Sequence, residues 1–405
     1  MMQRRQFLVR VAGLATAATL PGPVLAGGRP DRIVVVGGGI IGAAIAYRLA
    51  RRGARITLVD RVGASAGATS RSFAWLNAEF SKRPLHYHAL SRLGLSSYRV
   101  LEQELPGLPV QWGGAVQWCT EAAAAEDLRR QVRVQQEWGY PVRLIDAAQL
   151  HALEGEIRAG DARAATFADE EGFADPAATT QLLLDKAREA GAEIVFPCEV
   201  VGLALAAGRI SAVITTRGDI AADLVVVAAG VDTPTIAAMA GIDVPLLPAP
   251  GLLVHTRPMA PLLHHVAIGP VAHFKQYRDG RVVIGDDFGP PTTAAHDSLH
   301  RQPADFPDAT IRDLHAQRIL KQAARYLPAL ADAPVDRVTL GWRPLPRDGY
   351  PIVGRSARCP NLYLAVTHSG ITLAAVLSEL ASIEMLDGVE VQALAPYRPT
   401  RFAAG

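Results

Sequence analysis

The stretch that decides the fold is DRIVVVGGGIIGAAIAYRLARRGARITLVD, residues 31–60. Residues 32–36 form a β-branched apolar run, which predicts a strand buried on both faces. Residues 40–52 have helical spacing and strong helix formers, Gly53 ends this helix, and residues 55–59 predict a second strand. A strand, a helix and a strand in this order predict a βαβ unit of a parallel sheet.

Three glycines stand at the junction of the first strand and the helix. Gly37 permits a tight turn, Gly39 lets the backbone approach a pyrophosphate, and Gly42 lets helix and strand pack closely. Asp60 ends the second strand and can accept hydrogen bonds from an adenosine ribose, which argues against a 2′-phosphate. The stretch therefore predicts FAD or NAD, and a glycine-rich turn without a ligand is the alternative.

A small, hydroxyl-rich loop, GATSRS at residues 67–72, follows the second strand. Its hydroxyls and backbone N–H groups, at Thr69, Ser70 and Arg71, are suited to holding a pyrophosphate and the edge of a flavin. Ordinary turn chemistry is the alternative. The next residues include Phe73 and Trp75, which we expect to shape or crowd a flavin pocket.

The middle of the chain alternates helices with short extended segments. Asp175 and Pro176 begin a helix that runs to Glu189, with the aspartate as N-cap and proline in the first turn. A β-meander is expected through Val200 and residues 210–215 and 224–227, and Gly230 follows its last strand. Further helices are predicted at 86–105, 121–138 and 311–327, and residues 245–287 predict a mostly antiparallel sheet.

The C-terminal part contains GWRPLPRDGYPIVG at residues 341–354, a buried strand at 362–366 and the turn HSGIT at 368–372. This turn leads into a helix whose N-terminus could face the anionic edge of a flavin. Nucleotide-type strand-to-helix turns thus stand near both ends of the chain, with a β-rich insert between them. They predict an α/β fold: a discontinuous Rossmann-like FAD-binding domain with an inserted, mostly antiparallel substrate domain.

The N-terminus is predicted to be an export signal. Arg4 and Arg5 precede a short, proline-interrupted apolar run that ends in a small residue, Ala26. The pattern resembles a twin-arginine signal at residues 1–26, and a frayed basic terminus is the alternative. Because the twin-arginine route carries folded cargo, it suits a protein that acquires its cofactor before export.

Composition excludes several classes. The 405-residue chain has a net charge of +2 and no basic stripe, so no nucleic-acid partner is predicted. Its three cysteines, Cys119, Cys198 and Cys359, are far apart, which predicts neither a disulfide framework nor a zinc site. The histidines do not have metal-ligand spacing with carboxylates, so no metal is predicted.

These segments together resemble the FAD-dependent D-amino-acid oxidase superfamily, which includes glycine oxidase, sarcosine oxidase and D-amino-acid dehydrogenase. The resemblance covers about residues 31–396 and rests on VVVGGGIIGAAIAYRLARRG, GATS, FADEEGFADPAATTQLLLDKAREAGAEI, VVVAAGVDT, GRVVIGDD, GWRPLPRDGYPIVG and THSGITLA in this order. It implies an FAD domain formed by residues 31–105, 172–238 and 338–396, and a substrate domain formed by 106–171 and 239–337. The implied reaction is oxidation of the C–N bond of an amino acid or secondary amine, with hydride transfer to flavin N5 and hydrolysis of the imine.

The resemblance also implies site residues. In amino-acid-oxidising members the arginine of this G-x-R-P segment, here Arg343, holds the substrate carboxylate; a structural ion pair is the alternative. On the expected strand 273–277, either His273, Lys275 and Tyr277 or Phe274 and Gln276 face the pocket, and we favour Tyr277 as a substrate-side residue. The predicted FAD-binding residues are Gly37, Gly39, Ile40, Ile41, Gly42, Asp60, Arg61, Thr69, Ser70, Arg71, Val200, Gly230, Gly341, His368, Gly370, Ile371 and Thr372.

Several questions stay open from the sequence. A covalent flavin link through His86 or His88 is conceivable, because some relatives attach their flavin at a histidine in that neighbourhood. The expected partners are a small amine or amino acid and an electron acceptor, either oxygen or a respiratory carrier. The membrane is met only through the export machinery, and export predicts a periplasmic location. The alternative functions are oxidation of a donor without a carboxylate, and a non-catalytic flavin-retaining subunit of a larger oxidoreductase.

Overall fold

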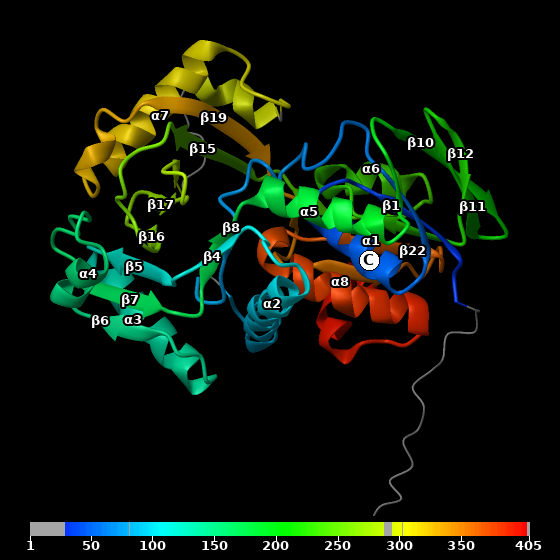
Figure 1. The fold of residues 1–405 in the computed structure, drawn as a ribbon, viewed down its shortest axis with the longest axis horizontal. Coiled ribbons are helices and arrows are strands. Elements are labelled where there is room, and N and C mark those ends of the chain that lie inside the picture. The colour runs from blue at the N-terminus through cyan, green and yellow to red at the C-terminus, as the bar shows by residue number, and fades with distance from the viewer. Residues whose placement is uncertain (1–28, 81, 287–293, 302, 403–405) are drawn as a thin grey trace, which may run out of the picture.

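The computed structural model describes residues 29–80, 82–286, 294–301 and 303–402. The expected export signal at residues 1–26 lies outside them. Figure 1 shows two parts: a six-stranded sheet with helices α1, α5 and α8, and an eight-stranded sheet with helices α3, α4 and α7. No helix in the described ranges has the length and apolar character needed to cross a membrane.

The six-stranded sheet contains the expected βαβ unit. Strands β1 (Arg32–Val36) and β2 (Arg55–Val59) pair in parallel, and α1 (Ile40–Arg51) connects them. The strand order is β21-β22-β13-β1-β2-β9, with only β21 antiparallel to its neighbour. The other strands are β9 (Glu193–Val195), β13 (Leu224–Val227), β21 (Ile352–Arg355) and β22 (Leu362–Val366).

Strand β1 is buried on both faces, as its apolar run predicts. Ile33 and Val35 belong to the core under α1, α5 (Pro176–Glu189) and α8 (Gly370–Asp387). Val34 and Val36 belong to a second core on the other face, which includes side chains of β10, β11 and α6. The cap of α5 is confirmed, since the Asp175 carboxylate accepts a hydrogen bond from the Ala178 N–H at 3.0 Å.

The expected β-meander is wrong at its last strand. Strands β10 (Val200–Ala206), β11 (Arg209–Thr215) and β12 (Gly218–Ala221) form an antiparallel three-stranded sheet. Strand β13 leaves this sheet and pairs in parallel with β1 and β22. The run of four consecutive apolar residues in β13 fits a strand buried on both faces rather than the edge of a meander.

The eight-stranded sheet has the order β19-β15-β18-β17-β16-β5-β7-β6 and is antiparallel except for the β16–β5 pair. It therefore confirms the expected mostly antiparallel insert. Strand β19 (Val335–Trp342) runs across the expected domain boundary at residue 338. The other strands are β5 (Ala115–Cys119), β6 (Arg143–Ile145), β7 (Ala164–Ala168), β15 (Pro250–Thr256), β16 (Val266–Ile268), β17 (His273–Gln276) and β18 (Val282–Gly285).

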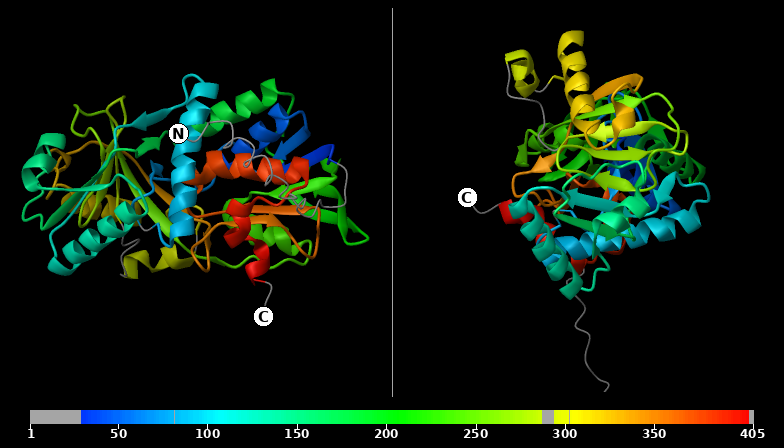
Figure 2. Two further views of the ribbon diagram at one scale, coloured as in Figure 1. Left: turned by 90° about the horizontal axis from the view of Figure 1, so that it is seen from below. Right: turned by 90° about the vertical axis from the view of Figure 1, so that its left-hand side faces the viewer.

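A long helix and a small sheet lie between the two parts. Helix α2 (Leu85–Glu104) packs on α8, and Figure 2 (left) shows it in cyan beside the six-stranded part. The small sheet has the order β3-β8-β4 and brings together residues from far apart in the chain. The remaining elements are β3 (Trp75–Leu76), β4 (Val110–Trp112), β8 (Gly172–Ala174), α3 (Ala122–Glu137), α4 (Ala147–Leu153), α6 (Thr233–Ala238), α7 (Ala309–Ala323), β14 (Leu246–Leu247) and β20 (Leu345–Pro346).

Candidate functional site

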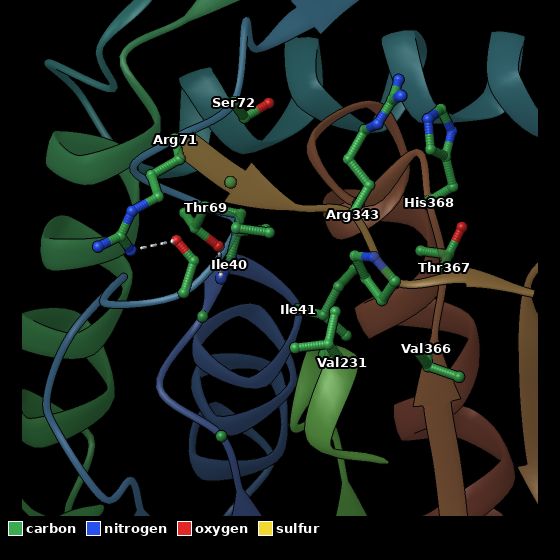
Figure 3. A pocket seen from close by; sticks show the side chains of 18 of the residues that line it. Ile40, Ile41, Thr69, Arg71, Ser72, Val231, Arg343, Val366, Thr367 and His368 are labelled. Atoms are coloured by element: carbon green, nitrogen blue, oxygen red, sulfur yellow. Dashed lines mark hydrogen bonds between the residues drawn. The ribbon is translucent and has the colours of Figure 1, made fainter. Parts of the chain in front are cut away.

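A cavity of about 800 Å³ extends from the carboxyl ends of β1, β2, β13 and β22 to residues of the eight-stranded sheet. In open α/β sheets, ligands bind at the carboxyl ends of the strands, where the strand order reverses. Strand β1 is such a point, because β2 lies on one side of it and β13 on the other. Figure 3 shows this cavity, with Arg71 and Thr69 toward one side and Arg343 and His368 toward the other.

The glycine turn before α1 forms the first part of the cavity wall. Gly37 has φ +119°, and a Cβ there would lie 2.4 Å from the Ala228 carbonyl oxygen. A Cβ on Gly42 would lie 1.9 Å from the Gly37 carbonyl oxygen, so Gly42 serves packing and does not line the cavity. Gly39, the N-cap of α1, lines the cavity together with Ile40 and Ile41. The N-terminus of α1 thus borders the cavity, where an anion would be stabilised.

Asp60 lines the cavity and also holds the glycine turn together. One carboxylate oxygen accepts the Gly38 N–H at 2.8 Å, and the other accepts the N–H groups of Val62 and Gly63 at 2.8 and 3.0 Å. A carboxylate has about four lone-pair sites, so contacts to a ribose remain compatible with these bonds. The neighbouring Arg61 lines the cavity and forms an ion pair with Asp232 at 2.8 Å.

The hydroxyl-rich loop contributes to the site in a different way from the one expected. The Thr69 hydroxyl accepts the Ile40 N–H at 3.1 Å, which joins the loop to the first turn of α1. The Arg71 guanidinium turns back and donates to the carbonyls of Ala66 and Gly67. Ser70 does not line the cavity, so the structure gives no support to its prediction as a cofactor residue.

Gly341 is explained by close approach. A Cβ at this position would lie 2.7 Å from the Cβ of Arg71. A larger residue would push the hydroxyl-rich loop away from the end of β19. Gly341 therefore allows the loop and the Arg343 segment to form one wall of the cavity.

The remaining predicted cofactor residues also line the cavity: Ile40, Ile41, Val200, Gly230, Gly370, Ile371 and Thr372. Gly230 has φ +58° and no atom within 4 Å of an added Cβ, so it is required by backbone conformation rather than by close approach. The Thr372 hydroxyl donates to the Trp75 carbonyl at 3.0 Å and accepts the Asn77 N–H at 3.3 Å. This residue fixes the segment after the loop against the start of α8.

Arg343 and His368 lie side by side and project into the cavity (Figure 3). The Arg343 guanidinium donates to the carbonyls of Ala249 and Pro250 at 3.3 and 3.1 Å, which fixes it at the cavity wall. Partial desolvation at the cavity wall, reinforced by the positive charges of Arg343 and Lys82, lowers the pKa of His368, although its side chain is exposed within the cavity. His368 is therefore a neutral imidazole at physiological pH.

Tyr277, which the sequence favoured as a substrate-side residue, does not line the cavity, so the structure gives this prediction no support. His273, two positions before Lys275 on β17, lines the cavity instead. Its ring packs edge-on against the Phe73 ring, with the two ring centroids 4.5 Å apart. Side chains on one face of a strand are about 7 Å apart, so only the first of the three reaches the cavity. The Tyr277 hydroxyl accepts a hydrogen bond from the Nζ of the buried Lys275 at 2.9 Å.

The side chains of His86, His88 and His265 contact other groups of the protein. Neither His86 nor His88 lines the cavity. The Nδ1 of His86 lies 2.9 Å from the Tyr397 hydroxyl, and the Nδ1 of His88 lies 2.9 Å from the Ala78 carbonyl oxygen. The structure therefore gives no support to a flavin link through either. His265 lies 2.9 Å from the buried Glu154 carboxylate, which also accepts the N–H groups of His264 and His265.

Several cavity residues had no signal in the sequence. Phe73 and Trp75 were expected to shape the pocket and do line it, but Asn77, Phe80 and Lys82 from the following segment were not predicted. These residues lie in an irregular segment between β3 and α2, so neither strand nor helix periodicity identifies a face. Only the packing of this segment against α8 brings them to the cavity.

The donor set fits FAD. The crowded glycine turn, the N-terminus of α1 and Asp60 provide sites for the pyrophosphate and the ribose. The cavity volume lies within the range of about 300–1,000 Å³ typical of ligand sites. In the described residues, no group of His, Cys, Asp and Glu has the arrangement of a metal site.

Comparisons with known proteins support this reading. Residues 32–382 match the DAO family, described as FAD dependent oxidoreductase. The chain is 26% identical to a glycine oxidase of Pseudomonas aeruginosa, over 91% of this chain and 98% of that protein. It is 28% identical to a 4-methylaminobutanoate oxidase (formaldehyde-forming) of Paenarthrobacter nicotinovorans, over 82% of this chain and 41% of that protein.

Solved structures share the fold. The crystal structure of glycine oxidase from Geobacillus kaustophilus superimposes with a TM-score of 0.79 and 24% identity, covering 93% of this chain and 99% of that one. The crystal structure of L-proline dehydrogenase from P. horikoshii superimposes with a TM-score of 0.81 and 23% identity, covering 93% of this chain and 98% of that one. The chain therefore belongs to the DAO family and is an FAD-dependent oxidoreductase.

Proposed function

We propose that this enzyme oxidises the C–N bond of a small amine or amino acid that carries a carboxylate. The observation that supports this most is the position of Arg343 beside a neutral imidazole, at the side of the cavity away from the α1 turn. A guanidinium matches a carboxylate with two parallel hydrogen bonds and stays charged at any pH of interest. Glycine oxidases and other amine oxidases among the relatives are consistent with this substrate class.

The roles of the residues follow from their geometry. Arg343 holds the substrate carboxylate and so orients the carbon that loses hydride, while Phe73, Trp75 and Phe80 exclude water from this part of the cavity. His368 is neutral and contributes a polar contact rather than a charge. Bound FAD would supply the acceptor for the hydride, which carries both electrons away from the amine-bearing carbon, and the resulting imine would be hydrolysed by water.

A spectroscopic experiment tests the proposal. The purified protein should show the yellow flavin spectrum, and anaerobic addition of substrates from a panel of D- and L-amino acids, glycine, sarcosine and related amines should bleach it. Bleaching by amines without a carboxylate, but by none with one, would support the alternative donor class. Bound flavin that no amine bleaches would support a non-catalytic subunit and contradict the proposal.

We also propose that the protein is exported to the periplasm by a twin-arginine signal at residues 1–26 and passes its electrons to a respiratory carrier. Arg4, Arg5 and the short apolar run support the signal, and cofactor loading before export supports the route for folded cargo. Replacing both arginines by lysine should leave flavin-loaded protein in the cytoplasm. Rapid reoxidation of the reduced enzyme by air, with hydrogen peroxide formed, would contradict the respiratory acceptor.

A further inference from the structure

Lys82 is a buried cation in the cavity wall that the proposed reaction does not use. Lys82 is only 6% exposed to solvent, and it lines the cavity. The ammonium donates to the Ser369 hydroxyl at 2.8 Å and lies 5.1 Å from the centre of the Tyr87 ring. The hydroxyls of Tyr87 and Ser369 are 2.8 Å apart, so all three side chains form one cluster.

The cluster has no negative charge within the described part of the chain. The partners of the ammonium are a hydroxyl and an aromatic ring, and no described carboxylate forms an ion pair with it. Ser369 is the N-cap of the 18-residue helix α8, whose first turn contains no acidic residue. Buried charges in proteins are normally paired, and a helix N-terminus favours anions over cations. An anion bound at this position would therefore be stabilised by both the ammonium and the helix N-terminus.

The positive charges of Lys82 and Arg343 both influence the His368 imidazole. Ser369 follows His368 directly, and the charges of both Arg343 and Lys82 reach the His368 ring. This part of the cavity thus presents two cations around a neutral histidine. A single carboxylate held by two parallel bonds to Arg343 satisfies only one of them.

We propose that Lys82, the Ser369 hydroxyl and the N-terminus of α8 bind a second carboxylate, so that the preferred substrate is a dicarboxylic amino acid or an imino diacid. This inference rests on the proposed function, in which Arg343 holds the first carboxylate. The anionic edge of the flavin is the other source of negative charge near this helix, and the experiments below separate the two.

Binding is tested first, with ligands that cannot be oxidised. Succinate and glutarate, and their monoamides succinamate and glutaramate, are titrated into the holoenzyme, and the flavin absorbance change gives Kd. The wild-type enzyme should bind each diacid at least 10-fold more tightly than its monoamide. Equal affinities in the wild type would overturn the inference without any variant.

Variants then assign the preference to Lys82. Lys82→Gln should remove the diacid preference, and Lys82→Arg, which keeps the charge, should restore most of it. The control Lys186→Gln removes a lysine that pairs with Glu189 on the surface of α5 and should keep the wild-type preference. Flavin content is measured for each variant, and affinities are compared per bound flavin. A preference that survives in Lys82→Gln would overturn the assignment.

Turnover separates this inference from the proposed function. The ratio of kcat/KM for iminodiacetate and aspartate to that for sarcosine and alanine should fall at least 10-fold in Lys82→Gln. Turnover of monocarboxylic amines with no diacid preference would overturn this inference and leave the proposed function standing. No turnover of either class would overturn the proposed function itself.

A separate titration with sulfite tests whether Lys82 serves the flavin instead of the substrate. Sulfite adds to oxidised flavin, and its affinity reports positive charge near the flavin. If Lys82→Gln weakens sulfite binding at least 10-fold while the diacid preference is unchanged, the cation serves the flavin and the inference is wrong. Loss of the diacid preference with sulfite affinity within about 2-fold of wild type supports the substrate site.

Discussion

At the α1 end of the cavity the wall includes residues 36–37, 39–41 and 60–62, close together in the chain, whereas at the Arg343 end it includes Lys82, His273, Arg343 and His368. The first end is built from backbone groups and glycines on consecutive elements. The second is built from side chains that four distant segments deliver. The first end therefore depends on local steric rules, and the second on how the two sheets and α8 pack together.

The largest effect is expected at the α1 end. Gly42→Val would place side-chain atoms against the Gly37 carbonyl oxygen, where even a Cβ lies at 1.9 Å. We expect a loss of about 4 kcal/mol or more in stability, little soluble protein and no bound flavin. Expression, flavin content and thermal unfolding measure this.

Gly53→Ala is the control for a glycine without crowding: Gly53 has φ +78°, unlike the helical Gly42, but nothing lies within 4 Å of an added Cβ. It should cost only about 1–2 kcal/mol and keep the flavin. Equal damage from both substitutions would contradict the crowded contact at Gly42 as the main limit on this end.

The second-largest effect, a loss of catalytic efficiency, is expected at the Arg343 end of the cavity. Arg343→Ala should lower kcat/KM for carboxylate-bearing amines by about 10²–10³-fold, since a charge-assisted bidentate contact is lost, with flavin content unchanged. Arg347→Ala, four residues later and exposed, serves as the control and should leave kcat/KM near wild type. Unchanged turnover in Arg343→Ala would remove the carboxylate clamp from the mechanism.

A smaller effect is expected for Asp60→Asn. The amide can accept from only one oxygen, so either the Gly38 N–H or the N–H groups of Val62 and Gly63 lose their acceptor. We expect FAD to dissociate about 10–100-fold more readily, as measured by the recovery of free-flavin fluorescence, with little change in substrate specificity. A change in specificity with unchanged FAD affinity would contradict the separation of the two ends.

The smallest effect concerns a buried carboxyl pair that supports the irregular segment before Lys82. Glu171 accepts the N–H groups of Ala78 and Glu79 at 2.7 and 2.8 Å, and the Tyr140 hydroxyl at 2.9 Å. Burial, together with the charge of Glu171, raises the pKa of Glu79, and burial raises the pKa of Glu171. The folded protein therefore keeps protons on this pair at pH values where the unfolded chain has released them.

The sign of the pH effect follows. Above the unfolded pKa of about 4.3 the folded state binds more protons than the unfolded state, so this pair lowers stability as pH rises toward the folded pKa values. Glu79→Gln should flatten the fall in unfolding free energy between about pH 5 and 8, measured by denaturant unfolding at each pH. Glu170→Gln is the control: it changes the adjacent, half-exposed carboxylate and should keep the wild-type slope. A steeper slope in Glu79→Gln would contradict this account.

The sequence predicted the α1 end well because its determinants are local. The apolar run of β1, the glycine turn, α1 and the acid at residue 60 lie within one βαβ unit, and each is governed by steric and hydrogen-bonding rules that act over a few residues. The cap of α5 was predicted for the same reason. Strand β13 was assigned to the wrong sheet because strand pairing is a long-range choice that its own residues do not specify.

At the other end the sequence alone determined the chemistry but not the arrangement. The motif around Arg343 was recognisable, yet Tyr277 was favoured over His273 because alternation on β17 identifies a face and not the depth at which it meets the cavity. Ser70 was included although it does not line the cavity, and Lys82 was missed because an irregular segment has no periodicity. Which distant side chains share a cavity is decided by the packing of α2, α8 and the eight-stranded sheet, and only the tertiary structure contains that information.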